Sequence, residues 1–438
     1  MARLADIHAR LTPAIVWLLR LAIGATFIMS GFVKGIDVWG SVYKISEYLT
    51  VWNLSVPESI ITIGAGLLAA VEFIWGLLLF FGTYRHMSVW GLLLIMCGML
   101  PLSAYIAIAN PVADCGCFGD FWVISNTATF VKNIFITAAL IYLAIYNNRV
   151  NGLYGTYIQW VIGGLATLYI LIIEVYGFNV QPMLDFRRFS EGVELIPSST
   201  ADGEDDEDNE AVYEFIYEHD GQQRAFTEDD LPEDTAWVFV DRHLISGNEH
   251  ADDGFTIIED GEDVAPYIIS NSGEQFIVTI PDIHRADLSS SYKINDLNDF
   301  ISGRGGSLVT LIGNSAEDND YWRDISMADY EIYSAEPTLI KELARGNVGL
   351  VYLNDGVVQW KRSLASINYA AMSAITGQDE MLDFLTPRSL RYLKTLTGIL
   401  LIILGGILVL DRSGRLVAWS LTNIINKIRN NKDTTPEP

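Results

Sequence analysis

Two cysteines separated by a single residue are the most reactive feature of the chain. Cys115 and Cys117 lie in the segment DCGCFGD at residues 114–120. Two thiols at this spacing can close a very small disulfide ring, and a strained ring is easier to reduce than an ordinary structural bridge. Gly116 between them can adopt the positive φ that such closure requires. The pattern predicts a disulfide, either redox-active or purely structural.

A metal site is the main alternative for these thiols. Metal sites usually have four ligands, drawn from His and further Cys residues. Residues 110–126 contain no His, and Cys97, the remaining cysteine, lies inside a long apolar segment. The sequence therefore favours a Cys115–Cys117 disulfide over a metal site.

Composition predicts a membrane protein with a large soluble insert. Half of the residues are hydrophobic (50%), yet the formal net charge is −26. Apolar residues concentrate at 14–176 and 394–410, and acidic residues concentrate between them. Such an acidic insert argues against nucleic acid and anionic lipid surfaces as its partners. It contains no cysteine, which excludes a disulfide-stapled secreted scaffold.

Six apolar segments are long enough to span a bilayer, which takes about 20 residues. They are residues 14–32, 60–81, 88–109, 127–146, 157–176 and 393–410. The first is too long for a signal-peptide core, so we expect a retained anchor. The aromatic-rich residues 34–58 are expected to form an interfacial loop. Residues 416–428 are expected to form a short amphipathic helix at the surface.

Two charged residues interrupt these segments. Glu72 lies near the middle of the second, where an acid must be paired, protonated or facing a cavity. Glu72 is therefore a candidate proton-handling residue, with an ion pair to Arg20 or Lys34 as the alternative. Arg20 itself is expected to extend toward the nearer membrane surface.

Basic residues predict the orientation. The amino terminus, the loops at Arg85 and Arg149, and the tail after residue 411 fall on one side of a six-span arrangement. Positively charged loops mark the cytoplasmic side. The protein is therefore expected in a bacterial inner membrane, with both termini cytoplasmic and the thiol loop and insert in the oxidising periplasm.

Three segments of the membrane part resemble the DoxX/MauE group of bacterial redox-associated membrane proteins. They are residues 30–37 (SGFVKGID), Glu72 after Ala69-Ala70-Val71, and the segment at 114–120. The resemblance covers roughly residues 10–146 and implies a four-helix core. MauE is associated with disulfide maturation of a periplasmic dehydrogenase, and DoxX proteins with quinone-linked chemistry. The resemblance therefore implies that Cys115 and Cys117 are a redox pair and that a quinone is the cofactor.

The end of the insert, residues 273–364, resembles a thioredoxin-like domain. The resemblance rests on residues 345–350 (RGNVGL) and on Asn354-Asp355-Gly356. Residues 281–286 carry no Cys-x-x-Cys, and Val348 stands where thioredoxins have a cis-proline. A domain without thiols cannot exchange disulfides, so we expect a docking module.

Together these patterns predict an α-helical membrane bundle with an inserted α/β thioredoxin-like domain and a small β unit. The β unit is expected to turn at Asp220-Gly221, and the α/β domain is expected to have strands at 276–280, 308–312 and 350–353 and a hairpin turn at 354–356. The expected divisions are a four-helix membrane domain at 1–150, a fifth span at 151–177, an acidic linker with the β unit at 178–272, the thioredoxin-like domain at 273–390, a sixth span at 391–412 and a basic tail at 413–438.

Two functions remain open from the sequence. In the first, Cys115 and Cys117 form the catalytic dithiol of a quinone-linked thiol–disulfide oxidoreductase, and Glu72 handles a proton. In the second, the bundle is a non-catalytic anchor whose extracytoplasmic domain docks periplasmic or envelope proteins. A transporter built on Glu72 and Arg20 lacks an inverted repeat in the sequence.

Overall fold

A computed structural model describes residues 2–112, 115–196, 212–219, 222–227, 238–246, 255–259, 262–313 and 316–433. The chain divides into two units. The first comprises Met1–Phe186 with Arg388–Pro438, and the second comprises Arg187–Pro387.

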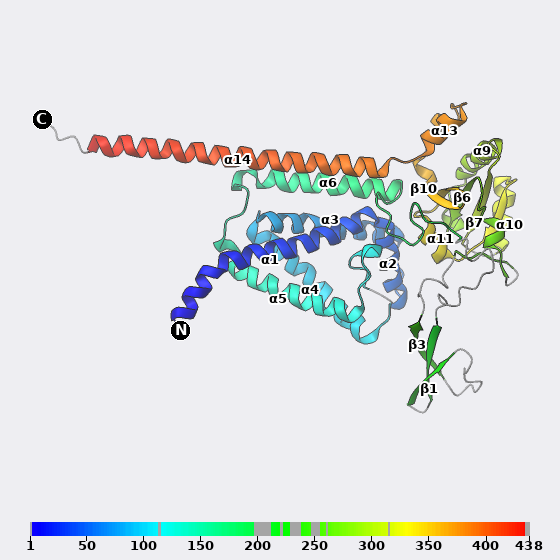
Figure 1. The fold of residues 1–438 in the computed structure, drawn as a ribbon, viewed down its shortest axis with the longest axis horizontal. Helices are drawn as coiled ribbons and strands as arrows, with labels where there is room; N and C mark the ends of the chain where they lie inside the picture. Colours follow the sequence, from blue (N-terminus) through cyan, green and yellow to red (C-terminus); the bar gives the residue numbers. More distant parts are fainter. Residues whose placement is uncertain are drawn as a thin grey trace. The chain divides into compact units, whose positions relative to one another are not determined.

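The first unit is a helical bundle (Figure 1). Across the described ranges, six helices are long and apolar enough to cross a membrane, which confirms the six predicted spans. They are α1 (Ala2–Ile36), α3 (Glu58–Phe81), α4 (Arg85–Ala109), α5 (Asn126–Tyr146), α6 (Gln159–Asn179) and α14 (Ser389–Asp433). The chain is therefore a multi-pass membrane protein.

Glycines allow α1 and α3 to pack with their backbones in contact. A Cβ atom on Gly31 would lie 2.4 Å from the backbone nitrogen of Phe73, and one on Gly76 would lie 2.7 Å from that of Ile28. Both distances are too short for any side chain larger than hydrogen. This close crossing brings the polar residues of α1 and α3 into mutual reach inside the bundle.

Residues 34–58 do not form the expected loop, and that prediction is wrong. They contain a short helix, α2 (Val38–Val51). Asp37 caps its start, because the Asp37 side chain accepts a hydrogen bond from the Gly40 backbone N–H. Val38, Trp39 and Val42 are buried because their spacing places them on one helical face. The aromatic residues of this segment thus pack the helix onto the bundle.

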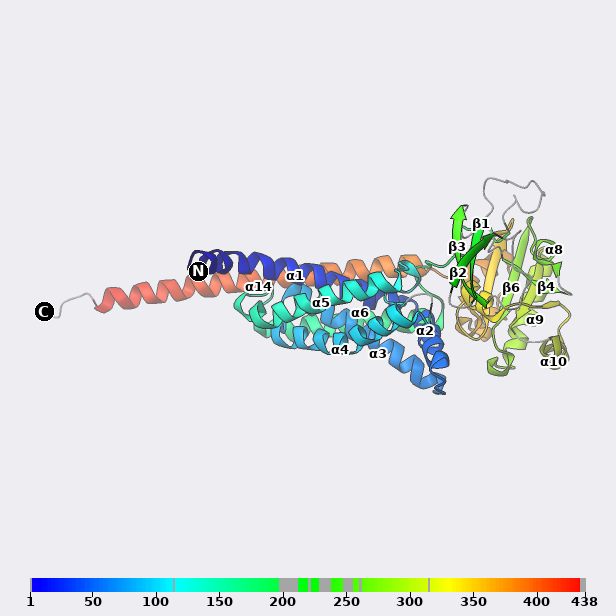
Figure 2. The same ribbon diagram turned by 90° about the horizontal axis from the view of Figure 1, so that it is seen from below.

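Residues 416–428 are helical as expected, but they do not form a short helix of their own, because α14 continues unbroken from Ser389 to Asp433. No proline interrupts this stretch. Asp411 accepts a hydrogen bond from the Gly155 backbone N–H at 3.0 Å, and Arg415 donates to the Leu153 carbonyl. These bonds fasten α14 to the loop before α6, and the two helices run side by side in both views (Figures 1 and 2).

Arg20 reaches the loop that follows α5, where protein rather than solvent surrounds its guanidinium. It is fully buried, and its guanidinium donates to the Asn147 side chain and to the carbonyls of Asn147, Val150 and Asn151. The carbonyls that follow the end of α5 attract a cation because helix C-termini carry partial negative charge. Arg20 thus closes one end of the bundle.

The opposite end holds the connections to the second unit. The hydroxyl groups of Tyr176 and Ser389 are 2.9 Å apart, so α6 ends where α14 begins. A Cβ on Gly177 would lie 2.2 Å from the Ile36 carbonyl oxygen, so the end of α1 lies here too. The rings of Phe121 and Phe186 meet at 4.9 Å, which places the segment after the thiols beside the exit to the insert.

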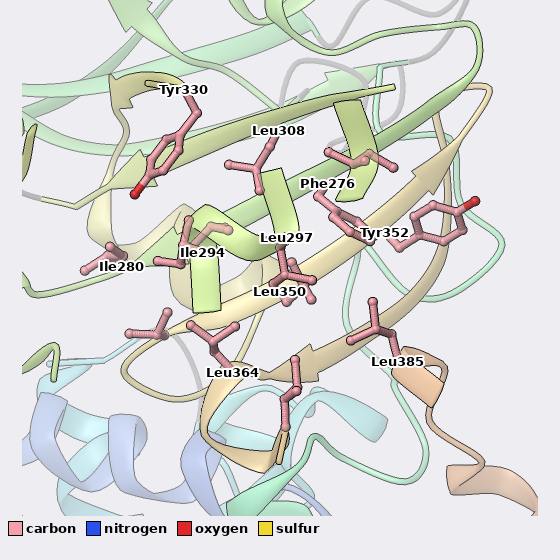
Figure 3. Close-up of a cluster of buried hydrophobic side chains, with 14 of the residues drawn as sticks. Phe276, Ile280, Ile294, Leu297, Leu308, Tyr330, Leu350, Tyr352, Leu364 and Leu385 are labelled. Carbon is pink, nitrogen blue, oxygen red and sulfur yellow. The ribbon is translucent and has the colours of Figure 1, made fainter. Parts of the chain in front are cut away.

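The second unit contains a mixed sheet in the order β10-β9-β6-β7-β8, with β6, β7 and β8 parallel and β9 and β10 antiparallel to their neighbours. The strands are β6 (Glu274–Ile280), β7 (Ser307–Ile312), β8 (Glu331–Ser334), β9 (Gly349–Asn354) and β10 (Val357–Ser363), with helices α9 (Ser290–Gly303), α10 (Ala316–Ser326) and α11 (Pro337–Leu343). Phe276, Leu297 and Leu350 meet in its core (Figure 3). An α/β domain is confirmed, whereas its thioredoxin likeness stays a prediction.

A hairpin turn closes this sheet as the sequence predicts. Asp355 and Gly356, between β9 and β10, have φ values of 51° and 76°. Positive φ at both central residues gives a turn whose twist matches that of the paired strands. The Asp355 side chain also accepts a hydrogen bond from the Gly273 backbone N–H.

A smaller sheet in the order β2-β1-β3 accounts for the predicted β unit. Its strands are β1 (Val212–His219), β2 (Gln222–Thr227) and β3 (Val238–Ser246). The acidic run at 202–210 and the turn predicted at Asp220-Gly221 lie outside the described residues. The short remaining elements are η1 (Gly119–Phe121), η2 (Asn147–Arg149), η3 (Thr156–Ile158), β4 (Ile258–Glu259), β5 (Glu262–Asp263), α8 (Ala265–Ile268), η5 (Ile283–Arg285), η6 (Leu364–Ser366), α12 (Tyr369–Met372) and α13 (Gln378–Leu385).

Candidate thiol site

The two thiols lie close enough to interact directly. The Sγ atoms of Cys115 and Cys117 are 2.9 Å apart, and both cysteines are free thiols. Gly116 has a φ of 65°, the positive value expected for the residue between two closely spaced cysteines. A Cβ on Gly116 would lie 2.7 Å from Cγ of Lys44 in α2, so a larger residue would also displace that side chain.

Hydrogen bonds from the helices hold this loop inside the end of the bundle. Tyr48 in α2 donates to the Cys115 carbonyl at 3.2 Å, and Ser30 in α1 lies 2.7 Å from the Cys117 carbonyl. Ser30 precedes the end of α1 by six residues, which is about 9 Å along the helix axis. Irregular backbone at such depth is tolerated because protein surrounds it. The thiols are thus set among the helices rather than above them.

A buried ion pair lies directly beneath the loop. Lys34 Nζ donates to the two carboxylate oxygens of Glu72 at 2.9 and 2.8 Å, and to Ser30 Oγ at 3.2 Å. Lys34 and Glu72 are 7% and 2% exposed. The Ser30 hydroxyl lies 2.7 Å from both the Glu72 carboxylate and the Cys117 carbonyl. Since it carries one proton, it can donate fully to only one of them at a time.

These contacts bring the predicted residues together. Glu72 pairs with Lys34, so the alternative pairing with Arg20 is wrong. Cys115, Cys117 and Glu72 occupy one site, joined through Ser30, while Cys97 lies exposed in α4. Whether Cys115 and Cys117 form a disulfide, and whether either residue or Glu72 is catalytic, stays a prediction.

Sequence reasoning missed Ser30 and Tyr48 as partners of the thiol loop. Ser30 and Lys34 are four residues apart on α1, a spacing that places them on one helical face. That spacing is a signal for Ser30, since Lys34 was already a candidate partner of Glu72. Tyr48 carries no comparable signal, because its role depends on α2 being helical.

Electrostatics make the two thiols unequal. The thiol of Cys115 donates a hydrogen bond to the sulfur of Cys117 and, with nearby Lys132 and Lys34, lowers the pKa of Cys117 to about 7 despite its burial. The same hydrogen bond and burial raise the pKa of Cys115. Lys132 also lies over the Phe118 ring, with Nζ 4.5 Å from its centre. Cys117 is therefore the more readily ionised thiol of the pair.

The reaction of reduced Cys117 with an alkylating reagent is expected to follow a thiolate titration with a midpoint near pH 7. An ordinary cysteine titrates near pH 8.5, so the midpoint of its alkylation rate would lie more than one pH unit higher than that of Cys117. Lys132→Met should move the midpoint upward, because it removes one of the cations that favour the thiolate. The measurement is the alkylation rate against pH, followed by mass spectrometry of the Cys117 peptide. A midpoint that stays near 8.5 in the wild type would contradict this assignment.

An exposed aromatic face lies beside the pair. The rings of Phe118 and Trp122 stack with centres 5.9 Å apart, and Trp122 is 61% exposed. In the described portion of the chain, no group of three or more His, Cys, Asp or Glu side chains is placed to hold a metal ion. A quinone as the cofactor stays a prediction.

Comparison with protein families identifies the membrane part. Residues 12–146 match the family described as methylamine utilisation protein MauE. This part of the chain is MauE-like. The match ends with α5, so α6, α14 and the second unit lie beyond it. Residues 211–245 match a domain of unknown function (DUF8463), which coincides with the small β sheet. A comparison with curated proteins found no match.

Proposed function

We propose that this MauE-like membrane protein carries out thiol–disulfide exchange at Cys115 and Cys117 on the extracytoplasmic side of a bacterial inner membrane. The observation that supports this most directly is the unequal pair of thiols, 2.9 Å apart and set above a buried Lys34–Glu72 ion pair. A structural disulfide needs no low-pKa cysteine and no neighbouring cations. A dithiol that exchanges with a partner needs both.

The chemistry follows from the state of each sulfur. The disulfide form of the pair accepts two electrons and two protons when a partner dithiol attacks it and leaves as a disulfide. In the reverse direction the Cys117 thiolate attacks a partner disulfide, and Cys115 then displaces the partner and closes the ring. At that step the Cys115 thiol loses its proton and attacks the Cys117 sulfur, and the partner sulfur leaves as a thiolate that takes up a proton.

The reduced pair must then be oxidised again. A bound quinone would supply this oxidation, taking two electrons and two protons and becoming a quinol. Phe118 and Trp122 would hold its ring, and Lys132 would favour negative charge on its oxygen. Val123, which follows Trp122 and is exposed, would face lipid, from which such a cofactor would arrive.

Glu72 and Lys34 act from below the loop. Lys34 adds a positive charge that favours the Cys117 thiolate, and Glu72 holds Lys34 in place. Glu72 is joined to the thiol loop through Ser30, and its carboxylate would take up a proton when a thiol is oxidised. Ser30 lies between this carboxylate and the Cys117 backbone, so a change at either one reaches the other.

The second unit contributes binding rather than exchange. It contains no cysteine, so it cannot form a mixed disulfide. Its thioredoxin-like character would make it a docking domain for periplasmic or envelope proteins whose thiols react at Cys117. The alternative function, a non-catalytic anchored scaffold for an envelope complex, is favoured by this lack of thiols together with the burial of Cys115, which is 8% exposed.

Reoxidation by a quinone tests the redox proposal. Protein purified in native lipids is reduced, freed of reductant and mixed with a soluble quinone analogue, and free thiols are then trapped and counted by intact mass. We expect loss of both thiols in the wild type and a slower loss in Trp122→Ala. A reduced pair that persists with the quinone and with partner disulfides would leave the scaffold function as the better explanation.

Orientation is predicted to place both termini in the cytoplasm. The reason is the clustering of Arg85, Arg149, Arg412 and Arg415 at the end opposite the thiols. Single cysteines replace Tyr267, which is 88% exposed, and Ser413 in a background without native cysteines. In intact spheroplasts an impermeant maleimide should label position 267 and spare position 413. Equal labelling of both positions would contradict the orientation.

A further inference from the structure

Glu174 is a second buried acid of the bundle, and nothing in the thiol chemistry uses it. It is the only charged residue of α6 and is 8% exposed. Its Oε1 atom is fully buried and has no hydrogen-bond partner among the described residues. An ionised carboxylate in such a position loses its hydration without compensation, which strongly favours the neutral form.

Glycines on the neighbouring helices make room for this side chain. A Cβ on Gly35 of α1 would lie 3.4 Å from Cγ of Glu174, and a Cβ on Gly66 of α3 would lie 3.7 Å from its Oε2. Since Gly35 and Gly66 carry no side chain, the Glu174 side chain lies against the backbone of α1 and α3 at these positions. The carboxyl group therefore lies between α1, α3 and α6.

The backbone around Glu174 also disfavours a negative charge. α1 ends at Ile36, and α6 passes so close that a Cβ on Gly177 would lie 2.2 Å from the Ile36 carbonyl oxygen. The carbonyls at a helix C-terminus carry a partial negative charge. They repel a carboxylate, whereas they can accept a hydrogen bond from a protonated carboxyl group.

The charged side chains on the helices packed against α6 are engaged elsewhere or exposed. Lys34 binds Glu72, Asp37 caps α2, and Lys44 pairs with Glu47. Glu58 lies at the first turn of α3, two turns from Gly66, and Arg391 and Lys394 of α14 are exposed. No cation among these described groups is bonded to Glu174.

We infer that Glu174 is a proton-binding site of the bundle, carrying its proton at neutral pH. The two buried acids of the bundle have opposite surroundings, since Glu72 is bonded to an ammonium group and Oε1 of Glu174 has no partner among the described residues. The proton on Glu174 is independent of whether the thiols exchange electrons.

Infrared spectroscopy detects this proton without any activity assay. The full-length protein in lipid is measured at pH 7 for the carbonyl stretch of a protonated carboxyl group, which shifts in D₂O. Ordinary glutamates, with pKa near 4.3, are ionised at this pH and give no such band. We expect one band in the wild type that Glu174→Gln removes. Glu47→Gln, at an exposed ion pair, is the matched control and should retain it.

Two results would overturn the inference. The first is a wild-type spectrum at pH 7 without a protonated-carboxyl band, which would mean that Glu174 is ionised. The second is a band that survives in Glu174→Gln and disappears in Glu72→Gln, which would assign the proton to Glu72. Since Gln matches Glu in size, both variants should fold, and the helical circular dichroism signal of each confirms that before the spectra are compared.

Discussion

Lys34→Met is expected to destabilise the protein so strongly that little folded protein accumulates in the membrane. Lys34 is the ion-pair partner of Glu72, and the Glu72 side chain is only 3% exposed. Removing one member of a buried ion pair leaves the other charged and unpaired, at a cost of about 3–5 kcal/mol. That is a large fraction of the roughly 5–15 kcal/mol that stabilises a typical domain. Accumulation and thermal unfolding in lipid measure the effect.

The double variant Lys34→Met/Glu72→Gln should recover much of the loss, because neither side chain is then charged. Lys44→Met is the matched control. Lys44 pairs with Glu47 at 2.9 Å, but their side chains are 23% and 44% exposed, so the change should cost less than about 1 kcal/mol. Met also keeps the methylene contact of Lys44 with Gly116. Equal losses for Lys34→Met and Lys44→Met would mean that burial of the first pair does not matter.

Much of the membrane part could be predicted because hydrophobic length is a strong signal. Five of the six predicted spans fall within a helix of the structure, and the span at 157–176 begins two residues before α6, in η3. The strands predicted at 276–280, 308–312 and 350–353 fall within β6, β7 and β9. The turn at Asp355-Gly356 was predictable because few residues adopt positive φ twice in succession. Local chemistry sufficed for all of these features.

The prediction of a loop at residues 34–58 was wrong, and the helix at 416–428 was predicted too short, because α2 and the length of α14 both depend on what packs beside them. Trp39 suggested a membrane-interface loop, yet it donates to the Phe178 carbonyl and stacks on the Phe178 ring at 4.9 Å. Asp411 suggested the end of a span, yet it binds the Gly155 backbone and lets the helix continue. Contacts between residues more than 130 positions apart leave no local pattern in the sequence.

The candidate site was predictable in its chemistry but only partly in its connections. Cys115, Cys117 and Glu72 stand out because thiols and intramembrane acids are rare. The sequence left the partner of Glu72 open between Arg20 and Lys34. That choice depends on the crossing of α1 and α3 at Gly31, which sets Lys34 level with Glu72. Arg20 lies about four turns earlier on α1 than Lys34, where the carbonyls of Asn147, Val150 and Asn151 bind it.

Replacing either cysteine is expected to stop turnover, but the two variants should fail differently. Cys117 has a pKa of about 7, so about half of it is thiolate at neutral pH, whereas a thiol of pKa near 8.5 is only a few per cent thiolate. Cys117→Ser should therefore slow attack on a model disulfide by tenfold or more. Cys115→Ser should leave Cys117 able to attack, yet unable to release the partner.

The distinguishing measurement is trapping in whole membranes. Cys115→Ser should accumulate a mixed disulfide between Cys117 and a partner protein, visible as a reductant-sensitive shift on non-reducing gels. Cys117→Ser should accumulate none, because Cys115 is buried and its raised pKa disfavours the thiolate. In the wild type, thiol trapping should find the resting pair as a Cys115–Cys117 disulfide. A wild-type pair found reduced in native membranes, with no mixed disulfide in Cys115→Ser, would remove the basis for exchange at this site. The cysteines would then serve only to position the loop that Ser30 and Tyr48 hold.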